Sequence, residues 1–123
     1  MEIRFENKVA FITGAAGGIG YAAARMFAEA GASVVMADLD SRVTDRAKEL
    51  EAEGHNAIGI RCDVSDEVQV KAAVEKAVAV FGKLDIAYNN VGIHAAVRED
   101  LAKTEGWDFD YVISVNLRGV WNC

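Results

Sequence analysis

The stretch TGAAGGIG, residues 13–20, decides the fold of this chain because it sets four glycines between a strand pattern and a helix pattern. Residues 8–13 form a short apolar run, as expected of a strand that is buried on both faces of a parallel sheet. After the loop, apolar residues recur at helical spacing, at Ile19, Ala23, Met26, Phe27 and Ala30. Gly31 ends this predicted helix as a C-terminal cap, so the loop joins a strand directly to a helix.

The same alternation of strand and helix patterns continues along the chain. Residues 33–38, 57–62 and 84–89 predict three further strands. The helices that follow are indicated by Val43, Ala47 and Leu50, then by Val70, Val74, Ala77, Val78 and Phe81 after a cap at Ser65 or Asp66, and last by a cap at Thr104. Such alternation is typical of βαβ units with right-handed crossovers. We therefore expect an α/β fold, a Rossmann-type doubly wound parallel sheet with strand order 3-2-1-4.

The glycine loop has the chemistry of an anion site. Gly14 permits a tight turn off the strand, Gly18 lets backbone amides approach a pyrophosphate, and Gly20 lets the helix pack closely on the sheet. The N-terminus of the helix adds free N–H groups and a partial positive charge. No Lys-Ser/Thr pair follows, so the loop is not one that binds nucleoside triphosphates. The loop predicts a dinucleotide site, whereas the glycines taken alone would indicate only a turn.

An acidic residue at the end of the second predicted strand supports the dinucleotide interpretation. Asp38 lies 18 residues beyond Gly20, where a carboxylate can accept hydrogen bonds from both ribose hydroxyls of an adenosine. The same carboxylate would repel a 2′-phosphate, and its neighbours offer no compensating charge because neither Leu39 nor Gly17 is basic. We therefore expect NAD rather than NADP. The alternative is that Asp38 merely caps a loop.

Composition and charge exclude several classes of function. The net charge of −6 opposes binding to nucleic acid or to an anionic membrane surface. The first residues are charged where a signal peptide would be apolar, so we expect a cytoplasmic protein. Cys62 and Cys123 form neither a disulfide framework nor a zinc pattern, His55 lies in a polar loop, and the sequence pattern shows no second metal ligand to accompany His94. We expect no metal site.

Four segments, taken in order, resemble the short-chain dehydrogenase/reductase family of the classical type. They are TGAAGGIG at 13–20, DV at 63–64, NNVG at 89–92 and VNLRG at 115–119. In the third segment valine stands where the family usually has alanine. The resemblance implies a cofactor site made by Thr13, Gly14, Gly18, Ile19, Gly20, Asp38, Leu39, Asp63, Val64, Asn90, Val91 and Gly92.

The resemblance also implies a reaction. Family members pass a hydride between a nicotinamide and a small-molecule alcohol or carbonyl, usually as homo-oligomers such as dimers or tetramers. Asn116 corresponds to the asparagine that holds a water in the family's proton relay. On chemistry alone, an amide within an apolar helix is as well explained by a structural role, because it must find hydrogen-bond partners.

The family's catalytic serine and Tyr-x-x-x-Lys pair do not occur here. Tyr21, Tyr88 and Tyr111 are followed four residues later by arginine, glycine and valine. The last predicted helix is apolar on most sides, and a helix of that kind requires cover. We therefore expect residues 1–123 to be the N-terminal, cofactor-binding part of one Rossmann domain, cut before its catalytic strand and helix, and inactive alone. The alternatives are a dinucleotide-binding module without turnover and, further behind, a methyltransferase.

Overall fold

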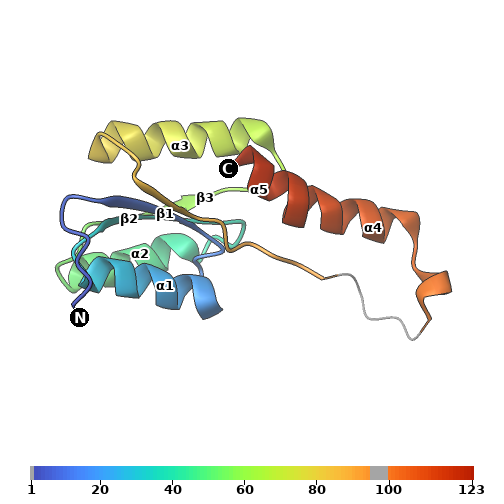
Figure 1. Ribbon diagram of the computed structural model, residues 1–123, viewed down its shortest axis with the longest axis horizontal. Helices are drawn as coiled ribbons and strands as arrows, with labels where there is room; N and C mark the ends of the chain where they lie inside the picture. Colours follow the sequence, from blue (N-terminus) through green and yellow to red (C-terminus); the bar gives the residue numbers. More distant parts are fainter. Residues whose placement is uncertain (1, 95–99) are drawn as a thin grey trace.

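The computed structural model describes residues 2–94 and 100–123. Their elements, in order, are β1 (Val9–Thr13), α1 (Gly18–Glu29), β2 (Ser33–Asp38), α2 (Val43–Ala52), β3 (Ala57–Arg61), α3 (Glu67–Phe81), β4 (Ile86–Tyr88), η1 (Leu101–Lys103), α4 (Gly106–Ile113), η2 (Ser114–Arg118) and α5 (Gly119–Asn122). The strands form a parallel sheet in the order β3-β2-β1-β4 (Figure 1). The predicted fold class and strand order are confirmed.

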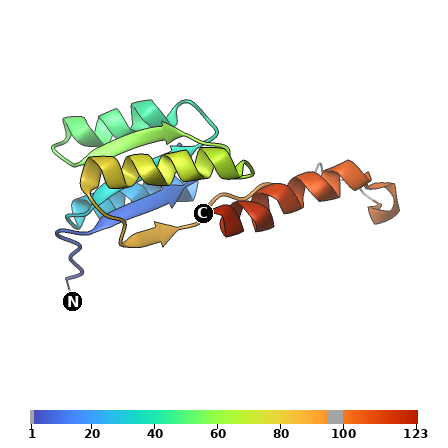
Figure 2. The same ribbon diagram turned by 90° about the horizontal axis from the view of Figure 1, so that it is seen from above.

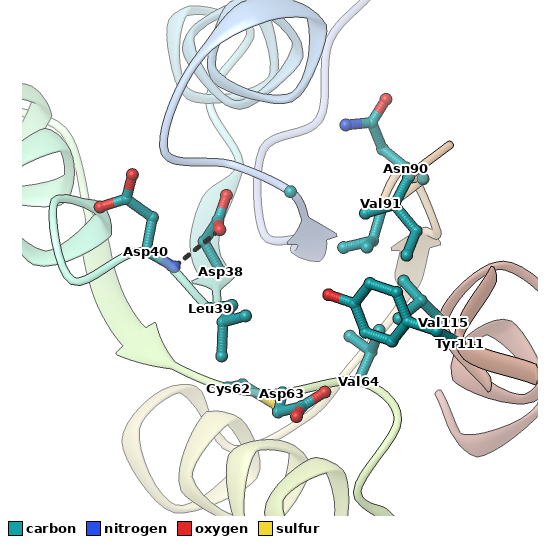
Figure 3. A pocket seen from close by; sticks show the side chains of 13 residues that line it. Asp38, Leu39, Asp40, Cys62, Asp63, Val64, Asn90, Val91, Tyr111 and Val115 are labelled. Carbon is teal, nitrogen blue, oxygen red and sulfur yellow. Dashed lines mark hydrogen bonds between the residues drawn. The ribbon is translucent and has the colours of Figure 1, made fainter. Parts of the chain in front are cut away.

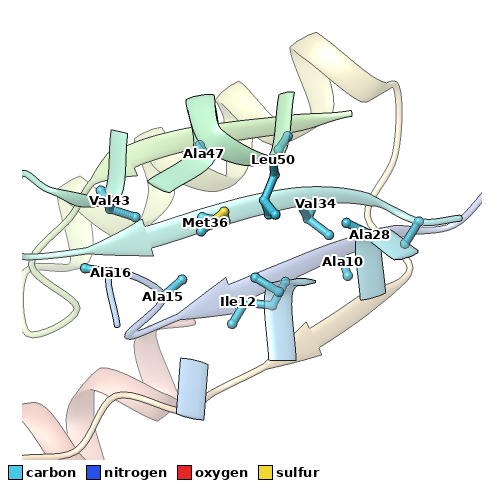
Figure 4. Packing of buried hydrophobic residues seen from close by; sticks show 13 residues of the cluster. Ala10, Ile12, Ala15, Ala16, Ala28, Val34, Met36, Val43, Ala47 and Leu50 are labelled. Atoms are coloured by element: carbon cyan, nitrogen blue, oxygen red, sulfur yellow. The ribbon is translucent and has the colours of Figure 1, made fainter. Parts of the chain in front are cut away.

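Helices cover the sheet on both faces, and each face has its own apolar cluster. Ile12, Met36 and Leu50 are fully buried between the sheet and helices α1 and α2 (Figure 4). Phe11 and Val35 belong to the cluster on the opposite face, under α3. Because neighbouring residues of a strand point to opposite faces, an uninterrupted apolar run such as β1 supplies both clusters at once. This is the doubly wound arrangement.

Helix α1 packs through small residues, and this corrects the face suggested by its larger side chains. Ile19 and Met26 are 72% and 70% exposed. The residues of α1 that are buried against the sheet are Gly20, Ala24 and Ala28. A Cβ added at Gly20 would overlap the carbonyl oxygen of Gly14, so the loop and the helix are in backbone contact at this point. Close approach of the helix, rather than the size of its side chains, decides its buried face.

The structure decides between the two predicted caps of α3, and it differs from the sequence prediction in two other details of the later helices. Asp66, and not Ser65, caps α3, because its side chain accepts the N–H groups of Val68 and Gln69. The predicted cap at Thr104 is wrong, since α4 begins after Glu105. On α3, Ala73 is buried while Val78 is 43% exposed. The cap and the inner face of a helix depend on how the element docks, which periodicity alone does not reveal.

The last helical segment runs through α4, the π-helix η2 and α5, and it extends away from the sheet (Figure 2). Its C-terminal end lies near α3. Many of its large apolar side chains are exposed. We call these residues the apolar ridge; they are Trp107, Phe109, Tyr111, Ile113, Leu117, Val120 and Trp121. Among the described residues, no helix is long and apolar enough to cross a membrane.

The contact between Gly14 and Gly20 predicts a sharp difference between two glycine substitutions. Gly20→Ala should destabilise the protein by about 1–3 kcal/mol, because the methyl group must displace backbone. Gly17→Ala is the matched control: its backbone is extended, and an added Cβ meets nothing within 4 Å. We expect it to change stability by less than about 0.5 kcal/mol. Urea denaturation of both variants measures this, and equal stabilities would contradict the packing described here.

Candidate nucleotide-binding site

A cavity of about 590 Å³ opens at the carboxyl ends of the strands (Figure 3). Its lining comes from every strand end and from the last helical segment: Gly14, Asp38, Leu39, Asp40, Cys62, Asp63, Val64, Asn90, Val91, Gly92, Ile93, Tyr111 and Val115. Strand β1 has β2 on one side and β4 on the other. The strands that follow β1 are therefore added first on one side of it and then on the other. Doubly wound sheets bind ligands at such a switch point.

The glycine loop borders this cavity through Gly14. Gly14 has φ of +68°, and a Cβ there would stand 2.9 Å from the side-chain nitrogen of Asn90. The helix α1 begins at Gly18, with no side chain capping its first N–H groups. Gly18 and Ile19 are exposed in that first turn, whereas Gly20 is buried against Gly14. The first turn of α1 therefore presents backbone N–H groups without a side-chain cap beside the cavity, and such groups can bind an anion.

Thr13 fastens the glycine loop to the end of β4. Its side chain is only 2% exposed, and its hydroxyl oxygen accepts the backbone N–H groups of Asn90 at 3.0 Å and Val91 at 3.3 Å. The residues that follow β4 would otherwise carry unpaired amides at the edge of the sheet. Thr13 is thus a structural part of the site, and it fixes Asn90, Val91 and Gly92 along one wall of the cavity.

Asp38 closes the opposite wall at the end of β2. Its Oδ2 accepts the N–H of Ala16 at 3.0 Å, and its Oδ1 accepts the N–H of Asp40 at 2.9 Å. A carboxylate oxygen can accept two hydrogen bonds, so both oxygens keep capacity for a ligand. Two backbone N–H groups fix the orientation of the carboxylate. The neighbouring Leu39 adds an apolar side chain to the same wall (Figure 3).

Asp63 and Val64 form the floor between β3 and α3. Asp63 Oδ1 accepts both the N–H and the hydroxyl of Ser65, at 2.9 and 2.7 Å, and the N–H of Asp63 donates to Gln69 Oε1 at 2.9 Å. Val64 is 5% exposed. The carboxylate thus shapes the turn before α3 in addition to lining the cavity.

The side chain of Asn116 is bonded to the segment after β4. Its Oδ1 accepts the N–H of Ile93 at 2.8 Å, and its Nδ2 donates to the carbonyl of Ile93 at 2.7 Å. The residue lies in the π-helix η2, a wide turn of a kind often found at functional sites. This paired contact supplies the partners that the amide requires. A relay role for Asn116 stays a prediction.

The structure adds five lining residues that the sequence analysis missed: Asp40, Cys62, Ile93, Tyr111 and Val115. Tyr111 and Val115 are four residues apart on the segment that precedes Asn116, and that spacing was the available signal. Tyr111 points into the cavity from α4 (Figure 3). Burial raises the pKa of Cys62 to about 11, so its thiol is a wall residue rather than a nucleophile.

Five of the predicted site residues do not line the cavity itself: Thr13, Gly18, Ile19, Gly20 and Asn116. Thr13 is the last residue of β1, the next three form the first turn of α1, and Asn116 lies in η2. Within residues 2–94 and 100–123, no group of three or more histidine, cysteine or acidic side chains is arranged to hold a metal ion. The structure brings together the Asp38 carboxylate on one wall, a floor made by Asp63 and Val64, and a loop of amide donors.

Known proteins with this arrangement are numerous. Residues 8–123 match the family model described as short chain dehydrogenase. The mitochondrial borneol dehydrogenase of Lavandula x intermedia is 45% identical over 119 residues, covering 96% of this chain and 44% of that protein. Secoisolariciresinol dehydrogenase of Forsythia intermedia is 43% identical and covers 98% and 43%. The chain thus spans less than half the length of these curated relatives.

Solved structures agree with the sequence comparison. A short chain dehydrogenase/reductase from Burkholderia phymatum, in complex with NAD, superposes with a TM-score of 0.91 at 37% identity, covering 98% of this chain and 42% of that one. A 3-ketoacyl-(acyl-carrier-protein) reductase from Brucella melitensis, complexed with NADH, gives 0.84 at 42% identity, covering 95% and 47%. The chain belongs to the short-chain dehydrogenase family of oxidoreductases, with its glycine loop and crevice in the Rossmann fold of that family.

Proposed function

We propose that this chain binds NAD and forms the cofactor-binding part of an oxidoreductase that transfers hydride between NAD and a small alcohol or carbonyl compound. The observation that carries the proposal is the position of Asp38: its carboxylate stands at the end of β2, across the cavity from Asn90 and beside the glycine loop. That pairing of an acid with amide donors matches the ribose and pyrophosphate of a dinucleotide.

The residues fit the cofactor piece by piece. The first turn of α1, at Gly18 and Ile19, would bind the pyrophosphate, and the positive φ of Gly14 makes the turn that brings the loop against Asn90. Asp38 and Leu39 would hold the adenine-side ribose, and Asp63 with Val64 would bound the adenine. The wall made by Asn90, Val91 and Gly92 would guide the chain of the cofactor toward its nicotinamide. When bound, NAD supplies the hydride-accepting ring.

The preference for NAD over NADP rests on charge. A 2′-phosphate would meet the Asp38 carboxylate at close range, and like charges repel strongly in a partly buried site. Leu39 cannot offset this repulsion because its side chain is neutral. The two solved neighbours named above bind NAD or NADH, which supports the same choice.

In the family, proton transfer requires a serine and a Tyr-x-x-x-Lys pair. None of the tyrosines in these 123 residues is followed four residues later by lysine. We propose that residues 1–123 are the N-terminal part of one NAD-binding domain, a view supported by the length of the relatives. In that protein Asn116, held in place by its two hydrogen bonds to Ile93, would hold the water of the proton relay. A cytoplasmic location also stays a prediction.

Self-association is part of the proposal. The apolar ridge exposes Leu117 and Trp121 at 63% and 72%. Large contiguous apolar patches mark interfaces in soluble proteins. We propose that this ridge mediates a homodimer or a tetramer.

The affinity of the purified protein for NAD⁺ and NADP⁺ tests the proposed function. Isothermal titration should show saturable NAD⁺ binding and at least tenfold weaker binding of NADP⁺. Asp38→Ala should lose about 1–3 kcal/mol of NAD⁺ affinity, because the ribose loses charged hydrogen bonds, and should narrow the NAD⁺/NADP⁺ ratio.

Asp40→Ala is the matched control for Asp38. Asp40 also lines the cavity, but its carboxylate is paired with Arg42 at 2.7 Å, and this guanidinium holds the pKa of Asp40 below its usual value. We expect the ratio of the two affinities to stay within a factor of about three. If the full-length protein bound NAD⁺ saturably but catalysed no turnover, the alternative of a dinucleotide-binding module would be favoured. Absence of NAD⁺ binding would reject the proposed function.

A substitution on the apolar ridge tests self-association. Leu117→Glu should shift the protein toward monomer in sedimentation velocity, because a buried carboxylate opposes an apolar interface. Met26→Glu places the same charge on α1, where Met26 is 70% exposed, and should leave the distribution unchanged. A monomeric unsubstituted protein at tens of micromolar would contradict this part of the proposal.

A further inference from the structure

Arg46 reaches from α2 into the glycine loop. Its Nε donates a hydrogen bond to the carbonyl oxygen of Ala16 at 3.2 Å. The backbone N–H of Ala16 donates a hydrogen bond to Asp38 Oδ2 at 3.0 Å. Ala16 is 5% exposed, so these two side chains take the place of water at its backbone. Residue 16 is therefore held at one end by the ribose-site carboxylate and at the other by the guanidinium.

The guanidinium is itself fixed in position. Its NH1 donates to both carboxylate oxygens of Glu49, at 3.1 and 3.2 Å. It also lies over the ring of Tyr21, 5.0 Å from the ring centre, and the Tyr21 hydroxyl donates to Glu49 at 2.9 Å. A planar guanidinium held by a carboxylate and an aromatic face loses little freedom on making a further hydrogen bond. Arg46 is thus preorganised to hold the loop.

We propose that Arg46 is a positioning residue of the dinucleotide site, acting through Ala16 on the Asp38 carboxylate. The inference rests on the proposed binding of NAD, and it deepens it. With Ala16 fixed, its N–H holds Oδ2 of Asp38 and so sets the orientation of the carboxylate, and the amides of the next residues would face the pyrophosphate. Without Arg46 the Ala16 carbonyl loses its partner, and the loop turns to find water.

Arg25 offers a matched comparison within the same cluster. It also lies over the Tyr21 ring, at 5.7 Å, and it pairs with Glu53 at 2.6 Å to join α1 to α2. Within the described part of the chain its side chain bonds to Tyr21 and Glu29 on α1 and to Glu53 at the end of α2, and not to the glycine loop. Replacing Arg25 therefore removes helix pairing and a ring contact while leaving the loop carbonyl bonded.

The test compares Arg46→Ala, Arg46→Lys and Arg25→Ala. For each purified variant, calorimetry gives the dissociation constant for NADH, and thermal unfolding gives Tm. Arg46→Ala should weaken NADH binding about fivefold, which is less than the full cost of a hydrogen bond to a charged donor because Arg46 acts through Ala16, and Arg46→Lys should recover part of the loss. Arg25→Ala should lower Tm comparably and keep the dissociation constant within twofold.

Hydrogen exchange at the Ala16 amide, measured without any ligand, gives a second readout. It should quicken in Arg46→Ala and stay unchanged in Arg25→Ala, because of these two arginines Arg46 alone donates a hydrogen bond to residue 16. Equal effects of Arg46→Ala and Arg25→Ala on NADH binding or on this exchange rate would overturn the inference. If the unsubstituted protein failed to bind NADH while the exchange pattern held, the proposed function would fail and the role of Arg46 in shaping the loop would survive.

Discussion

The backbone contact between Gly14 and Gly20 is the constraint on which the rest of the site depends. It brings the first turn of α1 against the end of β1, so a larger residue at position 20 would move the helix away from the sheet. That closeness explains why α1 buries small residues and leaves Ile19 and Met26 in solvent. It also leaves the N-terminus of α1 beside the cavity, where its amide donors are directed at a ligand.

Single polar side chains then fasten each wall of the crevice to the backbone opposite. Thr13 binds the amides after β4, Asp38 binds Ala16, and Asn116 grips both polar groups of Ile93. Each contact joins segments far apart in the chain, so the carboxyl ends of the strands form one preorganised surface rather than separate loops. A site held in this way binds its ligand without first ordering its own backbone.

The parts of this arrangement that follow from local pattern were predictable, and the parts that follow from docking were not. Alternating strand and helix patterns gave the 3-2-1-4 sheet, and the spacing from Gly20 to Asp38 located the acid at the cavity. The buried face of α1 was not predicted because the helical pattern was assigned from large apolar residues, whereas the helix packs on the sheet through Gly20, Ala24 and Ala28. Arg46 escaped because its partner lies 30 residues earlier in the sequence. No local pattern records such a contact.

An amide-resolved NMR titration with NADH tests the central claim, that the glycine loop and the cavity bind a dinucleotide, most directly. If that claim is right, saturable shifts will appear at residues 14–20, at Asp38 to Asp40, at Val64 and at Asn90 to Gly92, because these amides surround the cavity and its loop. Shifts confined to the apolar ridge, or no saturable shift at millimolar NADH, would contradict it.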